Sequence, residues 1–258
     1  MGMDFQSDHN RATYTTRNAD DSWKEIISEL VPIKNISKAL EIGCGGGIYL
    51  KALSDMGVPS VTGLDFSKAI LAGAQENCKN YKNIALKYGN ALHTGLEDNR
   101  FNLLLERALI HHIEDLNTCF KEAYRLLEDK GHFIIQDRTP EDCLLEGDSE
   151  HIRGYFFELF PRLIEKEKNR RHTSEKVIQT LEEVGFKEIE EVKLWEVRKV
   201  YENKEQLLTD LSERTGRSIL HELDDNELQL LINHIDRSIS SEQQIVEKDR
   251  WTIWKAIK

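Results

Sequence analysis

The sequence predicts an α/β fold in which a mostly parallel sheet carries helices on both faces. Three observations support this prediction. Short apolar runs alternate with helical patterns over residues 38–137, which is typical of successive βαβ units. Glycine or serine stands where several of these helices are expected to begin or end. Two long strand patterns then close the chain, which favours an antiparallel pair at one edge of the sheet.

The first half of the chain contains the elements of the parallel core. Strands are expected over residues 39–42, 61–64, 84–88, 103–105 and 133–135. Helices are expected over residues 47–56, 68–81 and 116–127, where apolar residues recur at helical spacing. Gly57 is placed to end the first helix in a left-handed conformation. Ser67 is placed to cap the second helix, and Gly131 to close the turn after the third.

The second half of the chain is less regular. An acidic loop is expected over residues 138–148, and an aromatic-rich helix over residues 151–168. Thr173 or Ser174 caps a further helix that stops at Gly185. The two closing strands are expected over residues 188–201 and 245–257, with a helical insertion over residues 203–240 between them.

Composition excludes several classes of protein. The formal charge of −11 over 258 residues makes nucleic acid an unlikely partner, since phosphate binding needs clustered Lys and Arg. A local basic run at residues 166–171 is more typical of a solvated helix end. No apolar run approaches the roughly 20 residues that span a bilayer, and the N-terminus lacks the apolar core of a secretory signal, so we expect a cytoplasmic address. The four cysteines form no CxxC pair, which argues against a disulfide framework or a zinc ribbon.

A glycine-rich loop follows the first expected strand, in the segment ALEIGCGGGIYL at residues 39–50. Gly43, Gly45 and Gly47 allow the backbone to pass close beneath a ligand that faces the N–H groups of the next helix. Ile48 stands where the dinucleotide fingerprint needs its third glycine, and the lysine of a P-loop is absent. Glu41 adds a negative charge that repels a pyrophosphate and suits an ammonium or sulfonium group.

The stretch ALEIGCGGG resembles the first motif of class I S-adenosylmethionine-dependent methyltransferases, and the later motifs follow in register over residues 40–137. By this resemblance, Asp65 takes both ribose hydroxyls, which suits a carboxylate with two acceptor oxygens. Asn90 reads the adenine edge in place of the usual Asp. Glu106 and Arg107 lie beside the methionine end. The residues expected to contact the cofactor are Glu41, Gly43, Cys44, Gly45, Gly47, Asp65, Phe66, Asn90, Ala91, Glu106 and Arg107.

The segment FNLLLERALIHHIEDL, residues 101–116, resembles the ubiquinone- and menaquinone-biosynthesis subgroup, which often carries a His-His pair. The resemblance implies a Rossmann-like, doubly wound, seven-stranded sheet of order 3-2-1-4-5-7-6, with the last strand antiparallel and a helical insertion before it. We expect a single domain over residues 1–258. Its parts are an N-terminal lid and helix (1–36), a cofactor-binding core (37–137), a substrate-lid insertion (138–172) and a helical insertion (202–242).

His111 is the expected catalytic residue. Methyl transfer from a sulfonium requires alignment of the nucleophile, and in some cases removal of a proton. Histidine suits that proton transfer near neutral pH, and His111 follows the carboxyl end of the fourth strand, where ligands of open α/β sheets collect. The alternative is a packing role for His111 with catalysis by alignment alone. No metal is expected, because no spacing makes His112 and its acidic neighbours converge.

The substrate side is expected to lie outside the parallel core. The resemblance places the N-terminal stretch with Tyr14, Arg17 and Trp23 over the cofactor as a lid. Arg138 follows the fifth strand, and Arg153 and Tyr155 lie in the aromatic-rich helix. Apolar walls with a few arginines suit a small organic substrate that bears a carboxylate or similar anion. The alternative for Arg138 and Arg153 is a set of surface ion pairs in an acidic protein.

The sequence therefore predicts a methyltransferase that uses S-adenosylmethionine, releases S-adenosylhomocysteine and acts on a small molecule. The alternatives are a methyltransferase of RNA or protein, and a cofactor-binding module without transferase activity. Ile48 and Glu41 oppose a third alternative, an NAD-dependent oxidoreductase.

Overall fold

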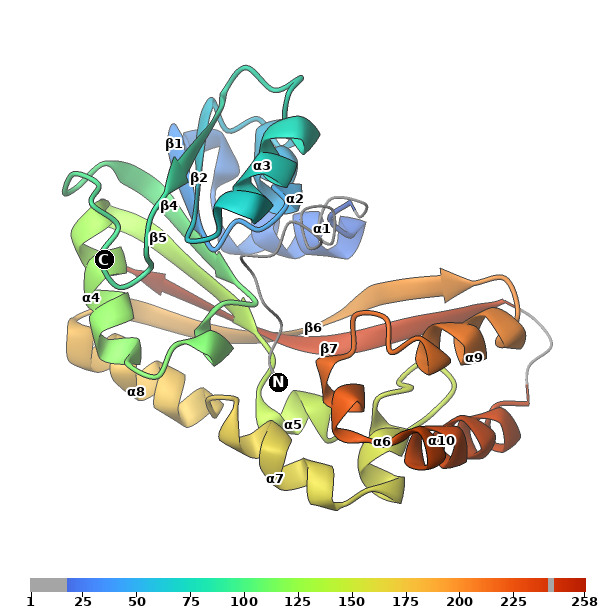
Figure 1. The fold of residues 1–258 in the computed structure, drawn as a ribbon. Coiled ribbons are helices and arrows are strands. Elements are labelled where there is room, and N and C mark those ends of the chain that lie inside the picture. Colours follow the sequence, from blue (N-terminus) through green and yellow to red (C-terminus); the bar gives the residue numbers. More distant parts are fainter. Residues whose placement is uncertain (1–17, 241–243) are drawn as a thin grey trace. The chain divides into compact units, whose positions relative to one another are not determined.

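The computed structural model describes residues 18–240 and 244–258 (Figure 1). Backbone packing divides these residues into two compact units. The sheet unit comprises residues 18–137, 174–194 and 252–258. The helical unit comprises residues 138–173 and the described part of 195–251. Two long strands contribute residues to both units.

The seven strands form one sheet of order β3-β2-β1-β4-β5-β7-β6, which confirms the predicted order. Its members are β1 (Lys38–Ile42), β2 (Ser60–Asp65), β3 (Ile84–Tyr88), β4 (Phe101–Arg107), β5 (Leu127–Asp137), β6 (Lys187–Tyr201) and β7 (Ile245–Ile257). The first five strands pair in parallel, and β7 runs antiparallel to β5. The carboxyl ends of β1, β2 and β4 therefore meet at one edge, where ligands of such sheets bind.

Alternating side chains give the sheet two buried faces. Leu40 and Leu104 pack in a cluster with α4 (Leu116–Leu126) and α8 (Ser174–Val184). Ala39 and Leu105 pack in a second cluster with α1 (Asp21–Leu30) and α2 (Ile48–Asp55). Successive residues of a strand point to opposite faces, so these alternating clusters confirm a doubly wound sheet. A further helix, α3 (Lys68–Asn77), begins where the Ser67 hydroxyl accepts the Ile70 N–H.

Three local expectations need correction. Gly131 does not close a turn, because β5 begins at Leu127 and the left-handed residue is Lys130 at φ 65°. The expected loop at 138–148 contains α5 (Pro140–Cys143), which begins with a reciprocal capping box between Thr139 and Asp142. The single helix expected over 151–168 is two helices, α6 (Gly154–Leu159) and α7 (Arg162–Asn169). Pro161 separates them because it has no N–H to continue a helix.

The helical unit has a hydrophobic core of its own. Besides α5, α6 and α7 it contains α9 (Lys204–Ser212), a 3₁₀ turn (Ser218–Glu222) and α10 (Asp225–Ser238). Phe156 and Leu163 pack in one cluster with Leu207 and Leu231. The segments expected as separate insertions at 138–172 and 202–242 thus share a single core. Across the described ranges, no helix has the length and apolar character needed to cross a bilayer.

Candidate functional site

The loop between β1 and α2 is held against the end of β2. Gly43, Gly45 and Gly47 have φ angles of 75°, 52° and 79°, in the left-handed region that favours glycine. The N–H groups of Gly43 and Cys44 donate to the Leu64 carbonyl at 2.7 and 3.0 Å. A Cβ atom at Gly47 would lie 2.6 Å from the Cys78 Sγ. The glycines are therefore required by backbone conformation and by the tight packing under the loop.

Asp65 ends β2 directly beside this loop. Its Oδ2 accepts the Gly45 N–H at 3.0 Å, and its Oδ1 accepts the Ser67 N–H at 2.9 Å. Burial raises the pKa of Asp65 in spite of these bonds. Each carboxylate oxygen can accept more than one hydrogen bond. The side chain is thus held in place while it keeps acceptor capacity for a ligand's hydroxyl groups.

Glu41 lies on β1 with only 2% of its surface exposed. Its Oε2 has no hydrogen-bond partner among the residues that the structure describes. Burial raises its pKa well above the ordinary value, and the nearby Arg107 offsets part of that shift. A buried carboxyl oxygen without a donor is costly. The hydroxyl and ammonium groups of S-adenosylmethionine are donors that would fit this position.

Arg107, at the end of β4, contacts the side chains of Gln136 and Tyr49, which come from other elements. Its Nε donates to the Gln136 Oε1 at 3.2 Å, and its guanidinium lies 4.3 Å from the centre of the Tyr49 ring. The same Gln136 oxygen accepts the Trp23 indole N–H at 2.8 Å. Trp23 was expected in the N-terminal lid, but it is fully buried in the core of the sheet unit. Tyr14 and Arg17 lie outside the described residues.

Glu106 faces the opposite side of the sheet from Arg107. It is fully buried and accepts a hydrogen bond from the Cys119 thiol of α4 at 3.4 Å. Burial raises its pKa to about 8, and the charge of Asp137 adds to the shift. The side chain is therefore mainly neutral at pH 7. On the other face, Arg107 and Glu41 share the side of the sheet that carries α1 and α2.

The adenine-side residues lie after β2 and β3. Phe66 is 47% exposed. Asn90 is exposed, and its Oδ1 accepts the Leu92 N–H at 2.9 Å, which stabilises a local turn. Ala91 is buried beside it. The amide oxygen expected to meet an adenine amino group thus already has one donor, although a carbonyl oxygen can accept two.

The chain turns sharply after β4, and this turn brings His111 to Asp137. Ala108 has a φ of 50°, which is uncommon for a residue with a side chain. A 3₁₀ turn, Ile110–His112, follows. The Nδ1 of His111 lies 3.0 and 2.9 Å from the two carboxylate oxygens of Asp137, which is 1% exposed. Asp137 was not among the expected site residues; its place at the carboxyl end of β5 was the available signal.

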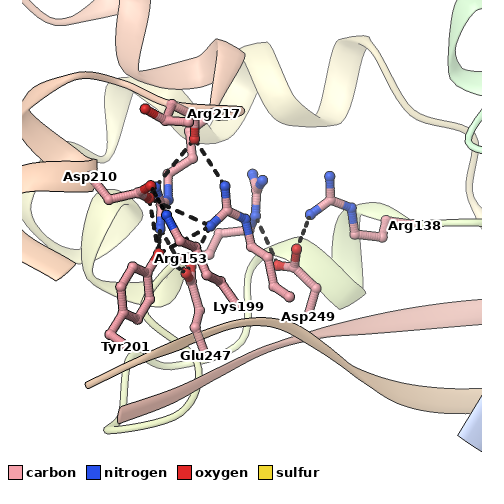
Figure 2. A network of polar contacts seen from close by, with 10 residues as sticks. Arg138, Arg153, Lys199, Tyr201, Asp210, Arg217, Glu247 and Asp249 are labelled. Atoms are coloured by element: carbon pink, nitrogen blue, oxygen red, sulfur yellow. Dashed lines mark hydrogen bonds and ion pairs between the residues drawn. The ribbon is translucent and has the colours of Figure 1, made fainter. Parts of the chain in front are cut away.

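Among the expected substrate residues of the helical unit, Arg153 and Tyr155 are buried, and the Arg138 side chain is 15% exposed. Arg138 Nη1 lies 3.1 Å from the Asp249 Oδ2, and Arg153 Nε lies 3.5 Å from the Asp249 Oδ1 (Figure 2). Tyr155 belongs to the hydrophobic core and packs edge-on against His234. Both arginines form the ion pairs of the alternative expectation, but Arg153 is buried, so a surface location is wrong for that residue. No group of three His, Cys, Asp or Glu side chains suited to a metal occurs within the described part of the chain.

Comparison with known proteins agrees with this geometry. Residues 40–135 match the methyltransferase domain family. The demethylmenaquinone methyltransferase of Staphylococcus carnosus (strain TM300) is 34% identical over 149 residues, which cover 57% of this chain and 62% of that protein. That of Staphylococcus haemolyticus (strain JCSC1435) is 27% identical over 180 residues, which cover 65% and 75%. The chain thus spans less than two thirds of the first of these relatives.

Solved structures share the fold at low sequence identity. A putative methyltransferase from Bacillus halodurans C-125 superposes with a TM-score of 0.61 at 17% identity, over 91% of this chain and 98% of that one. Phosphoethanolamine N-methyltransferase 2 of Haemonchus contortus, solved with S-adenosyl-L-methionine, has a TM-score of 0.59 at 20% identity, over 100% and 60%. These findings confirm the expected resemblance to class I S-adenosylmethionine-dependent methyltransferases of the menaquinone-biosynthesis type.

Proposed function

We propose that this chain, whose core is a class I methyltransferase domain, transfers a methyl group from S-adenosylmethionine to a small organic molecule. One observation carries the proposal. The left-handed glycine loop, the Asp65 carboxylate that holds it and the donor-deficient Glu41 lie together at the carboxyl ends of β1 and β2. That combination offers carboxyl acceptors to a ligand with hydroxyl and ammonium donors, whereas a pyrophosphate, whose oxygens accept hydrogen bonds, needs a cradle of donors.

Different residues of the sheet unit would bind different parts of the cofactor. Asp65 would accept the ribose hydroxyls, and Asn90 with Phe66 and Ala91 would receive the adenine. Glu41, the glycine loop and Arg107 would bind the methionine end. Glu106, which faces α4, would act by packing beneath this region. The cofactor supplies an activated methyl group on a positively charged sulfur, so the protein's task is alignment and proton transfer.

His111 is the proposed proton acceptor. Its contact with the Asp137 carboxylate favours a proton on Nδ1 and leaves the Nε2 lone pair to accept one from the nucleophile. In this proposal His111 acts on the substrate, and Asp137 acts through His111 as a positioning residue.

The names of the relatives suggest a quinone-type acceptor, because the curated relatives described above are demethylmenaquinone methyltransferases. The family match at residues 40–135 lies within the sheet unit, however, and the whole described part of the helical unit lies outside it. We therefore propose a small-molecule acceptor and derive its chemistry from the helical unit itself. No described feature favours RNA or protein as the acceptor.

Calorimetry tests the cofactor assignment. S-adenosylmethionine and S-adenosylhomocysteine should bind the full chain at micromolar strength, whereas NAD should give no heat. Binding of NAD in their place would reject the proposed function. Tight cofactor binding without methyl transfer to any member of a broad acceptor panel would favour the module without transferase activity.

A further inference from the structure

The helical unit contains a buried guanidinium that lacks hydrogen bonds. Arg153 is 7% exposed, yet its side chain makes no hydrogen bond within the described part of the chain. Its Nε is buried and unsatisfied. Its two ion pairs are long, at 3.5 Å to the Asp249 Oδ1 and 3.7 Å to the Glu167 Oε1. A buried guanidinium N–H without an acceptor is costly, and in Arg153 this is the N–H of Nε.

Neither carboxylate near Arg153 belongs to it alone. Asp249 lies closer to Arg138, at 3.1 Å. Glu167 is hydrogen-bonded at 2.5 Å to the Arg171 Nε and also lies 3.7 Å from the Arg170 Nη1. The surrounding arginines keep the pKa of both carboxyls below its ordinary value despite burial. Both acids are therefore ionised, and each lies closer to another arginine than to Arg153.

His151 adds a second unsatisfied group two residues away. It is 1% exposed, and its Nδ1 lies 3.2 Å from the Glu146 carbonyl oxygen, an acceptor. Its Nε2 is buried without a hydrogen-bond partner within the described ranges. Trp195 packs edge-on against the ring. One loop thus brings two buried nitrogens that make no hydrogen bond in the described part of the chain, the Arg153 Nε and the His151 Nε2, into the interior.

A neighbouring network shows that this unit can satisfy a buried arginine fully. Arg217 is 2% exposed as a side chain, and its guanidinium donates to Asp210, to the Tyr201 hydroxyl at 3.0 Å and to Glu247 at 2.7 Å (Figure 2). Arg198 donates to the same Glu247 at 2.8 Å. Every charge there has a short, direct partner. Arg153 is buried like Arg217 but lacks the hydrogen bonds that Arg217 makes. A purely structural role therefore does not account for the burial of Arg153.

We infer that Arg153 and His151 form a binding site for an oxyanion, a phosphate or carboxylate group, of the methyl acceptor. A planar guanidinium binds two oxygens of such a group at once. An imidazole nitrogen suits a third oxygen, either as donor or as acceptor from a protonated oxygen. The identity of the ligand as the methyl acceptor rests on the proposed function.

The site can be tested on the full chain with inorganic phosphate and acetate as probes. We expect phosphate, acetate or both to bind in calorimetry and to raise the melting temperature by a few degrees at saturation. The preferred probe distinguishes a phosphate-bearing acceptor from a carboxylate-bearing one. Arg153→Gln should weaken that binding at least about tenfold, the effect of losing a charge-assisted pair. Arg153→Lys should retain part of the affinity, since it keeps the charge but loses the fork.

The melting temperature without anion separates a ligand role from a structural one. Arg153→Gln should melt at or above the wild-type temperature in anion-free buffer, because it removes a poorly compensated buried charge. Arg217→Lys, the matched control in the satisfied network, should melt lower but keep wild-type phosphate or acetate affinity. A lower melting temperature for Arg153→Gln together with unchanged anion binding would overturn the inference, as would a wild-type chain that binds neither probe.

Binding of S-adenosylhomocysteine, measured on the same samples, keeps the two proposals apart. If it binds and the anions do not, the oxyanion site is rejected and the proposed methyl transfer stands. If the anions bind at Arg153 and S-adenosylhomocysteine does not, the site stands and its link to a methyl acceptor fails.

Discussion

The Nδ1 of His111 lies within 3.0 Å of both carboxylate oxygens of Asp137, and the backbone N–H of His111 donates to the same carboxylate at 3.2 Å. Asp137 therefore holds the ring and the 3₁₀ turn together. This contact links the ends of two neighbouring strands, β4 and β5, across 26 positions of sequence. Because Asp137 occupies Nδ1 of His111, Nε2 is the imidazole nitrogen that is left for a ligand.

Asp137→Asn should remove the preference of His111 for the tautomer protonated on Nδ1, because an amide can donate to Nδ1 as well as accept from it. We expect ¹⁵N NMR of the histidine rings to show protonation of Nε2 in the variant and of Nδ1 in the wild type near pH 8. With an identified acceptor, turnover should fall about 100-fold, while S-adenosylhomocysteine affinity changes little. Asp115→Asn, at the exposed cap of α4, is the control. An unchanged tautomer would remove Asp137 from its positioning role.

Asp65→Ala should weaken binding of S-adenosylhomocysteine by about 1.5–3 kcal/mol, the scale for losing hydrogen bonds to a charged acceptor. Part of this loss comes from freeing the Gly45 N–H that the carboxylate now holds. Calorimetry provides the measurement. Asp98→Ala, which removes an exposed partner of Arg125, should leave the affinity unchanged, and equal affinities in the two variants would exclude Asp65 from the ribose site.

Gly47→Ala and Gly57→Ala form a matched pair, since both glycines are left-handed, with φ of 79° and 99°. A Cβ at Gly57 meets nothing within 4 Å, whereas one at Gly47 meets the Cys78 Sγ at 2.6 Å. Chemical denaturation should show a loss of about 1 kcal/mol for Gly57→Ala from backbone strain. Gly47→Ala should lose a further 1–3 kcal/mol, roughly the cost of overpacking.

Removal of the clashing sulfur tests this explanation. In a double-mutant cycle, Cys78→Ala should recover most of the additional loss in Gly47→Ala but none of the loss in Gly57→Ala. Additive effects of Gly47→Ala and Cys78→Ala would show that the steric argument is wrong.

Glu106→Gln should change how stability depends on pH. Burial raises the pKa of Glu106 from its ordinary 4.5 to about 8. Between these values the unfolded chain releases the proton and the folded chain keeps it, so the free energy of unfolding falls as the pH rises, and this contribution levels off above pH 8. The neutral variant does not show this decrease in the free energy of unfolding. Urea unfolding should find it more stable than wild type by about 1–3 kcal/mol at pH 8.5, with little difference at pH 4.5.

Glu122→Gln is the control of opposite sign. Burial works against ionisation of Glu122, but hydrogen bonds from Arg125 and Thr94 outweigh it and lower the pKa to about 2. The folded chain therefore ionises Glu122 above about pH 2, and the resulting stabilisation is complete above the ordinary pKa of 4.5, so this variant should lose stability at pH 8.5. A Glu106→Gln variant that is also destabilised at pH 8.5 would mean that burial does not raise the pKa of Glu106.

Patterns within a few residues predicted the parallel core well. The spacing of Gly43, Gly45 and Gly47, the acidic end of β2 and the cap at Ser67 all depend on local backbone conformation, which neighbouring residues set. The strand order came from the resemblance that these motifs carry, and the sheet agrees with it. Errors arose where strand pairing with distant residues overrode a local turn signal. Gly131 is an example, because it lies inside an 11-residue strand.

Local patterns predicted the candidate site less well than the parallel core. Sequence alone pointed to His111 but not to Asp137, and to Glu106 and Arg107 together although they face opposite sides of the sheet. Periodicity does not reveal which strands are neighbours, so it cannot pair two side chains at different strand ends.

By itself, then, the sequence determined the class of fold, the glycine loop with its carboxylate and the methyltransferase resemblance, because each depends on short spacings along the chain. Only the tertiary structure decided that two distant segments share the core of the helical unit, that Arg153 is buried without hydrogen bonds, and that Asp137 holds His111. Burial and pairing of this kind follow from which elements pack together, and that is a property of the whole chain.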